Sequence, residues 1–118
     1  MIQSFHDLQV YEESYRLALE VYRASEAYPK EERYGLASQI QRAAISIPLN
    51  LAEGYGKHES AAEFKRYIRM AMGSANEIEV LLNLLKDLGY MTVEKAEELK
   101  EKYIAARKQL YRLQEKWN

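Results

Sequence analysis

The sequence of 118 residues contains no cysteine, which excludes disulfide bonds, thiolate metal sites and cysteine nucleophiles. It has only two prolines and five glycines, and because both residues are costly inside helices, their scarcity favours long helices. No apolar run approaches the roughly 20 residues needed to span a bilayer. Residues 1–7 lack the basic start and the apolar stretch of a signal peptide. We therefore expect a cytoplasmic protein without a membrane partner.

Side chains suited to catalysis are also scarce. The two histidines, His6 and His58, fall at expected helix starts or loops, and no serine, histidine and carboxylate set suggests a triad. Helical bundles bind metals through Glu-x-x-His pairs, which do not occur here. Glu77 and Glu79 are two residues apart and so lie on different faces of a helix, where they cannot hold one ion together. We expect no enzyme activity, no metal and no cofactor.

The residues that are present fit one globular domain spanning residues 1–118. Hydrophobic residues make up 47% and charged residues 30% of the chain, which is ordinary for a soluble protein of this length with a hydrophobic core. The net charge of −1 leaves the whole molecule without a bulk attraction for phosphate or anionic lipid. Any contact with nucleic acid must therefore depend on a local cluster of cations.

Apolar residues recur at alternating spacings of three and four along four stretches, which predicts four amphipathic helices. The first covers residues 7–27, with a buried stripe of Leu8, Tyr11, Tyr15, Ala18 and Tyr22 beside a second stripe of Val10, Leu17, Val21 and Ala24. The second covers residues 31–53. The third runs from Ser60 to a turn at Gly89, with Phe64, Ile68, Ala71, Ala75, Ile78, Leu82 and Leu85 buried. The fourth follows Thr92, with Ala96, Leu99, Tyr103, Ala106, Leu110, Leu113 and Trp117 buried.

Short connections make consecutive helices antiparallel neighbours, so we expect an all-α, antiparallel up-down four-helix bundle. Ser60 and Glu63 have the spacing of a capping box at the start of the third helix, and Thr92 is a suitable N-cap for the fourth. Pro48 interrupts the backbone hydrogen bonding of the second helix. Because apolar residues stay in register across it, we favour a kink; the alternative is a break into two short helices.

The second helix is apolar on two sides. At about 100° per residue, one face carries Leu36, Ile40, Ala43, Ala44, Ile47 and Leu51, and a nearly opposite face carries Ile45, Leu49 and Ala52. One bundle core covers only one face, so we expect another subunit to cover the second. The alternative is that Ile45 and Leu49 are singly exposed aliphatic residues, which are common.

A narrow polar strip separates these two faces and consists of Gln39, Arg42, Ser46, Asn50 and Glu53. We expect it to lie at the edge of a subunit contact or to face an internal cavity. Arg42 and Glu53 are expected to pair with each other or with the backbone of a neighbouring subunit.

Two sets of basic residues are candidates for nucleic-acid binding: Lys65, Arg66 and Arg69 on the third helix, and Lys108, Arg112 and Lys116 on the fourth. The alternative is a solvated helix face whose cations complement the macrodipole at the end of the fourth helix. Most tyrosines fall in the predicted buried stripes, where they are not available to stack on bases. Binding through these cations should be directed at the phosphate backbone and weaken steeply with salt.

The segment from Tyr34 to Gly54, YGLASQIQRAAISIPLNLAEG, resembles the most typical segment of a bacterial four-helix-bundle family. That family includes the 23S ribosomal RNA intervening-sequence proteins and the accessory variability determinants of diversity-generating retroelements. The similarity extends over nearly the whole chain, through Phe5-His6-Asp7-Leu8, Tyr28-Pro29, Glu63-Phe64 and Met72-Gly73-Ser74.

The resemblance implies a four-helix bundle that assembles as a ring-shaped homopentamer. It also implies a non-enzymatic scaffold or accessory protein with weak nucleic-acid binding. The alternative that it implies is a nucleic-acid-binding accessory subunit of a retroelement reverse transcriptase. The retroelement proteins are markedly basic, whereas this chain is slightly acidic.

Overall fold

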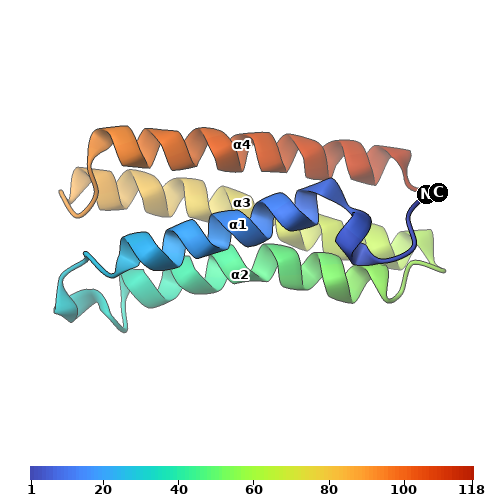
Figure 1. Cartoon of the computed structure of the whole chain (residues 1–118), viewed down its shortest axis with the longest axis horizontal. Helices are drawn as coiled ribbons and strands as arrows, with labels where there is room; N and C mark the ends of the chain where they lie inside the picture. The colour runs from blue at the N-terminus through green and yellow to red at the C-terminus, as the bar shows by residue number, and fades with distance from the viewer.

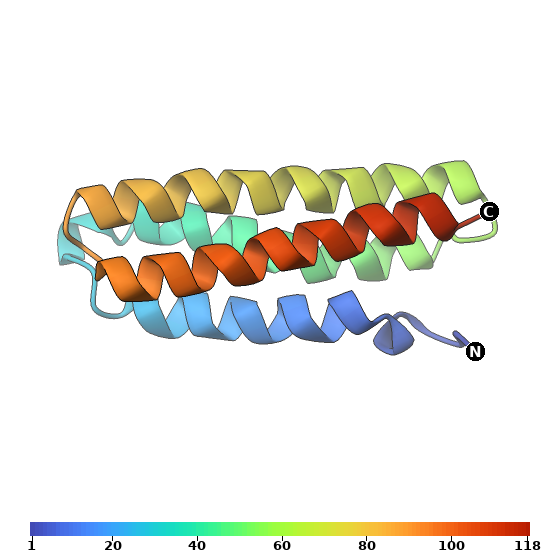
Figure 2. The same ribbon diagram turned by 90° about the horizontal axis from the view of Figure 1, so that it is seen from above.

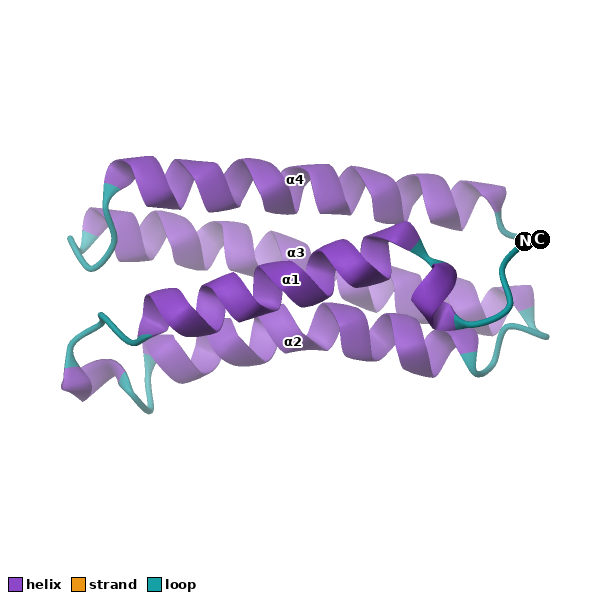
Figure 3. Cartoon of the chain, viewed as in Figure 1, coloured by secondary structure: helices purple, strands orange, loops and turns teal.

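A computed structural model describes residues 1–118 and contains helices without strands (Figure 3). The four α-helices are α1 (Gln9–Ser25), α2 (Leu36–Tyr55), α3 (Ala61–Asp87) and α4 (Val93–Lys116). Two short 3-10 helices, η1 (Phe5–Asp7) and η2 (Lys30–Glu32), precede α1 and α2. The predicted all-α fold with four helices is confirmed.

The helices lie side by side in an elongated molecule of 44 × 23 × 19 Å. The turns that join α1 to α2 and α3 to α4 lie at one end, and the α2–α3 turn lies at the other end with both termini (Figures 1 and 2). Each helix contacts two neighbours, and α1 makes no contact with α3. The helices α1 and α3 are therefore diagonal to each other, and so are α2 and α4.

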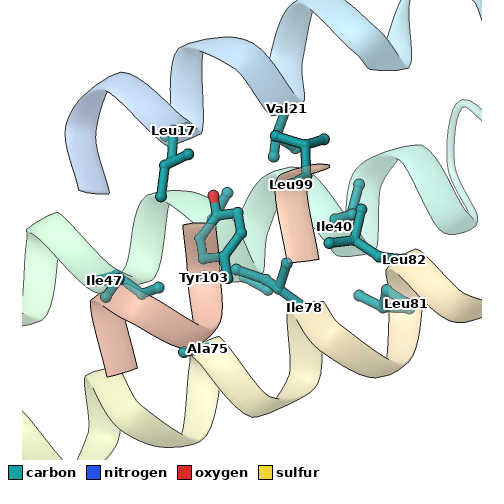
Figure 4. Packing of buried hydrophobic residues seen from close by; sticks show 14 of the residues in the cluster. Leu17, Val21, Ile40, Ile47, Ala75, Ile78, Leu81, Leu82, Leu99 and Tyr103 are labelled. Carbon is teal, nitrogen blue, oxygen red and sulfur yellow. The ribbon is translucent and has the colours of Figure 1, made fainter. Parts of the chain in front are cut away.

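The core runs along the axis between the four helices, and each helix contributes to it. Leu17 from α1, Ile47 from α2 and Ile78 from α3 surround the Tyr103 ring of α4 (Figure 4). Full burial of an aliphatic or aromatic side chain of this size contributes about 1.5–3 kcal/mol. The predicted stripe of α3 is entirely buried, and the predicted inner face of α2 is buried except for a half-buried Leu36. In α4 the stripe is buried as far as Leu110.

The buried face of α1 differs from the prediction. Tyr15 and Tyr22 are exposed, whereas Ser14 and Ser25 are buried. The two serine hydroxyls donate to the backbone carbonyls of the residues three positions earlier, at 3.0 and 2.7 Å. A serine whose hydroxyl is satisfied within its own helix can be buried at little cost. The prediction counted only apolar residues and therefore placed the buried stripe too far toward the tyrosines.

The helix ends show which predicted caps are formed. Thr92 accepts a hydrogen bond from the Lys95 backbone at 3.1 Å, and Ser60 accepts one from the Glu63 backbone at 3.2 Å. The predicted capping box at Ser60 is only half formed, because the Glu63 carboxylate turns outward to Arg66 at 3.1 Å. The first two helices start later than predicted, since 3-10 turns occupy the residues before Leu8 and Arg33.

Pro48 lies inside a continuous α2, so the alternative of a break into two helices is wrong. The proline has no N–H to donate to the carbonyl of Ala44. Apolar packing on both sides of that position keeps the helix in register, since Ala44, Ile47 and Leu51 are fully buried.

Candidate nucleic-acid interface and outer apolar face

Both predicted sets of cations lie at the end of the molecule that holds the termini. The start of α3 lies beside the end of α4 (Figure 2), with the rings of Phe64 and Trp117 4.6 Å apart at their centroids. Between the two helices, a groove of about 300 Å³ is lined by Met72, Arg107, Lys108, Tyr111 and Arg112. The fold therefore brings together two basic segments that are about 40 residues apart in sequence. We call this region the basic end; it comprises Lys65, Arg66, Arg69, Arg107, Lys108, Tyr111, Arg112 and Lys116.

The cations of α4 differ along its length. In the first half, Lys95 pairs with Glu20 at 3.3 Å, Lys100 with Glu97 at 2.9 Å and Lys102 with Glu98 at 3.2 Å. In the second half, the predicted binding residues form no ion pair within 4 Å; these are Lys108, Arg112 and Lys116. Their positive charge is therefore left for an external anion.

The cations of α3 are not equivalent either. The Arg66 guanidinium binds Glu63 at 3.1 Å and lies over the Tyr67 ring, 4.7 Å from its centroid. These contacts raise the pKa of Arg66, chiefly through the hydrogen bond to the Glu63 carboxylate. Lys65 and Arg69 form no ion pair. Arg66 is therefore the least available of the six predicted cations.

Two residues of the basic end were not predicted as site residues. Arg107 is held between Asn76 at 2.7 Å and Glu79 at 2.9 Å. Tyr111 has 53% of its surface exposed beside the groove. The expectation that most tyrosines are buried is wrong, because only Tyr28, Tyr67 and Tyr103 are buried among the ten.

The polar strip of α2 divides into two groups. The Ser46 hydroxyl is hydrogen-bonded to that of Ser74 at 2.5 Å and so joins α2 to α3. Asn50 donates to the Ser46 carbonyl at 2.8 Å, a bond within α2. Gln39, Arg42 and Glu53 are exposed. The predicted pair of Arg42 with Glu53 does not form within the chain, since eleven residues of helix separate the two by about 16 Å.

The second apolar face of α2 is not covered by the chain itself. Leu49 is 51% exposed, and Ile45 and Ala52 are half-buried. The outward side of the adjacent α3 adds Met70, Val80 and Leu84, which are also exposed. Both helices therefore carry aliphatic side chains that the chain leaves partly uncovered. We call Ile45, Leu49 and Ala52 the α2 ridge.

The two histidines are exposed and stack on aromatic neighbours. The His58 ring lies 4.3 Å from the Tyr55 ring, and the His6 ring 4.2 Å from the Phe5 ring. His58 also has its Nδ1 2.6 Å from the Tyr55 carbonyl. No group of three or more histidine and carboxylate side chains is close enough to hold a metal ion. No helix combines the length and apolar character needed to cross a membrane.

The sequence and the fold both resemble those of known proteins. No curated protein matches the chain. A crystal structure from Bacteroides thetaiotaomicron, of a protein of unknown function from the S23 ribosomal protein family, superimposes with a TM-score of 0.81. That protein is 26% identical, and the match covers 90% of this chain and 95% of the other. The family model for the 23S rRNA-intervening sequence protein matches residues 6–112. This match spans nearly the whole bundle, and the chain belongs to the 23S rRNA-intervening sequence protein family.

Proposed function

We propose that the protein is a non-enzymatic scaffold that assembles as a homopentameric ring. The observation that carries this proposal is the second apolar face of α2, where Leu49 is half exposed between Ile45 and Ala52. Burial of such side chains is favourable at about 25 cal/mol per Å². A surface of this kind on a small domain marks an interaction site, and a second copy of the chain is always available to cover it.

The size of the molecule permits such a ring. A stable protein interface buries about 800 Å² on each partner, and each subunit of a ring has two neighbours. Two contacts of that size would cover roughly a quarter of the 7037 Å² that the chain exposes. The basic end and the opposite end of the bundle would both remain accessible.

Light scattering of the purified protein tests this proposal. We expect a particle of five times the 13.8 kDa of one chain. A stable monomer at micromolar concentration would overturn the proposal. The charge change Ile45→Glu should dissociate the ring and leave the helical circular dichroism signal largely intact, because Ile45 lies outside the core cluster.

A second candidate function is nucleic-acid binding at the basic end. The observation that favours it is the contrast along α4, where the first-half lysines are ion-paired and Lys108, Arg112 and Lys116 are not. The exposed Tyr111 ring lies among these cations and offers a surface on which a base could stack. A ring would repeat the basic end five times, so that weak single contacts would add through multivalency.

Fluorescence anisotropy with labelled RNA and DNA over a series of salt concentrations tests this function. Binding should fall steeply as salt rises, since phosphate contacts release counterions. The double variant Lys108→Glu, Arg112→Glu should abolish binding. A matched control is Lys30→Glu, Arg33→Glu, which reverses two exposed cations without ion pairs near the other end of the bundle. Absence of binding even at low salt would rule out nucleic-acid binding at the basic end.

The protein partner of such a ring is a further part of the proposal. A symmetric ring offers identical docking surfaces, and a retroelement reverse transcriptase is the partner that the alternative interpretation implies. A reverse-transcriptase gene next to the gene for this protein would support that role, and location within an rRNA insert would support the intervening-sequence role. Copurification with the encoded reverse transcriptase would test the contact directly.

A further inference from the structure

The outward side of α1 carries a row of large exposed side chains. Tyr15, Leu19 and Tyr22 are 48%, 40% and 43% exposed, and their spacing of four and three residues places them on one face. Scattered exposed apolar residues are common, but these three occupy successive outward positions on one helix. We call them the α1 ridge. The rest of the chain leaves nearly half of each of these side chains uncovered.

The α1 ridge and the α2 ridge match in length. Ile45, Leu49 and Ala52 have the same spacing of four and three residues, so each ridge spans about two turns of helix. Charged residues bound both ridges. Arg42 and Glu53 lie just beyond the two ends of the α2 ridge, are exposed and form no ion pair.

We propose that the α2 ridge of one copy packs antiparallel on the α1 ridge of the next copy, a contact that rests on the homo-oligomer proposed above. In this register Ile45 lies against Tyr22 of the next copy and Leu49 against its Leu19. Ala52 lies against its Tyr15, so the smallest residue of the α2 ridge leaves room for a tyrosine ring.

The same register brings opposite charges together. Arg42 lies beside Glu26 of the next copy, and Glu26 is exposed and without an ion pair. At the other end of the contact, Glu53 lies beside Arg16 of the next copy. Arg16 already binds Glu12 at 2.7 Å, but most of its side chain is exposed and can bind a second carboxylate. Neither Arg42 nor Glu53 has such a partner within its own chain.

Ring symmetry fixes the direction of the two helices. Copies related by a rotation axis along the bundle point the same way, and α1 and α2 run in opposite directions within each copy (Figure 1). An α2 helix therefore meets the α1 helix of the next copy antiparallel. A parallel contact would place Arg42 beside Glu12 instead, and it would require the next bundle to be inverted.

The position of the two ridges favours closure over a filament. The helices α1 and α2 are neighbours in the bundle, so their outward sides point in different but not opposite directions. A head-to-tail contact between such faces turns each successive copy in the same sense, and the chain of copies closes into a ring. Ridges on the diagonal helices α1 and α3 would instead extend the assembly in a line.

A charge-swap cycle followed by sedimentation velocity tests the register. Arg42→Glu and Glu26→Arg should each raise the dissociation constant of the ring by about tenfold or more, because each places like charges in contact. The double variant should regain most of the wild-type assembly. The combination of Arg42→Glu with Glu12→Arg should not. A double variant at 42 and 26 that stays dissociated, or rescue through residue 12, would overturn the proposal.

Crosslinking gives an independent test, because the chain has no cysteine of its own. Leu19→Cys chains refolded together with Leu49→Cys chains should yield disulfide-linked dimers, and in this mixture no chain can form a disulfide with itself. Each variant alone should stay uncrosslinked, because in the proposed contact neither residue faces the same residue of another copy. Leu19→Cys with Leu84→Cys is the matched control. Leu84 is exposed on α3 and lies outside the proposed contact, so this combination should not crosslink.

The two proposals fail in different ways. If the wild-type protein is monomeric, both the scaffold proposal and the proposed contact are wrong. If the wild-type protein assembles but the mixture of the variants at 19 and 49 gives no crosslinked dimer, the scaffold proposal stands and this contact is wrong. Crosslinking by a single variant would indicate a two-fold contact and also reject it.

Discussion

At the scale of single residues, the hydroxyls of Tyr28 and Tyr103 are buried without a hydrogen-bond partner, and Tyr103 is the more deeply buried of the two. The Tyr103 ring is 1% exposed in the centre of the core, and the hydroxyl points toward α1 (Figure 4). An unsatisfied buried polar group costs about 1–3 kcal/mol. Burial also raises the pKa of the phenol, because the charged phenolate is disfavoured in an apolar core.

Replacement of Tyr103 by phenylalanine is expected to leave the free energy of unfolding unchanged or to raise it by about 1 kcal/mol, since the unpaired hydroxyl is removed and the ring remains. A raised phenol pKa stabilises the fold below the unfolded pKa of about 10, and the stabilisation is lost as pH rises toward the folded pKa. The free energy of unfolding, measured with urea, should fall less between pH 8 and pH 11 in Tyr103→Phe than in the wild type. A loss as large as that of wild type would contradict this account, and Tyr34→Phe, at an exposed tyrosine, is the control.

At the scale of helices, two glycines have opposite roles. Gly54 near the end of α2 faces α3, where an added Cβ would lie 2.5 Å from the Cβ of Tyr67. Gly73 lies in the middle of α3, and an added Cβ would meet nothing within 4 Å. One glycine therefore allows two helices to approach, and the other only reduces helix propensity.

The same substitution should thus have opposite effects at the two sites. Gly73→Ala should raise the free energy of unfolding by about 0.5–1 kcal/mol through helix propensity. Gly54→Ala should lower it by about 1–3 kcal/mol, because overpacking moves α2 away from α3. Chemical denaturation of both variants measures the two effects. Equal stabilisation by both would show that α2 and α3 do not approach closely at Gly54.

The sequence was most informative about helices whose buried stripes are purely apolar. Every residue of the predicted stripe of α3, from Phe64 to Leu85, is buried, because apolar side chains mark these inward positions; Tyr67 and Leu81 are buried beside it and were not predicted. It was misleading for α1, where Ser14 and Ser25 occupy inward positions and tyrosines lie outward. Hydroxyl groups satisfied within a helix leave no mark in an apolar pattern.

The candidate site was predictable only in part, for a related reason. Lys108, Arg112 and Lys116 could be selected by their spacing of four, which places them on one side of a helix. Their lack of ion pairs could not be predicted, because pairing depends on tertiary neighbours. Lys95 and Lys102 have the same residue type, yet both bind Glu20 of α1. The exposure of Tyr111 likewise depends on how α3 and α4 pack.

At the scale of the whole molecule, assembly and stability should be linked. A ligand that binds only the folded state stabilises it by mass action, and in a homo-oligomer the other subunits act as that ligand. A tenfold rise in protein concentration should add about 1 kcal/mol of stability per chain if unfolding accompanies dissociation. For a chain of 118 residues, that corresponds to a rise in melting temperature of about 3–6 °C.

The melting temperature of the wild-type protein should therefore rise with concentration, and Arg42→Glu should need at least about tenfold more protein to reach the same melting temperature. Arg42 is exposed and forms no ion pair within its chain, so its reversal breaks no intramolecular ion pair and is expected to act on the assembly. Calorimetry over a hundredfold range of concentration distinguishes the two. Arg33→Glu is the control, because Arg33 is equally exposed and unpaired but lies outside both ridges; it should keep the wild-type dependence. A melting temperature independent of concentration in all three proteins would mean that each subunit is stable alone and that the ring contributes nothing to the fold.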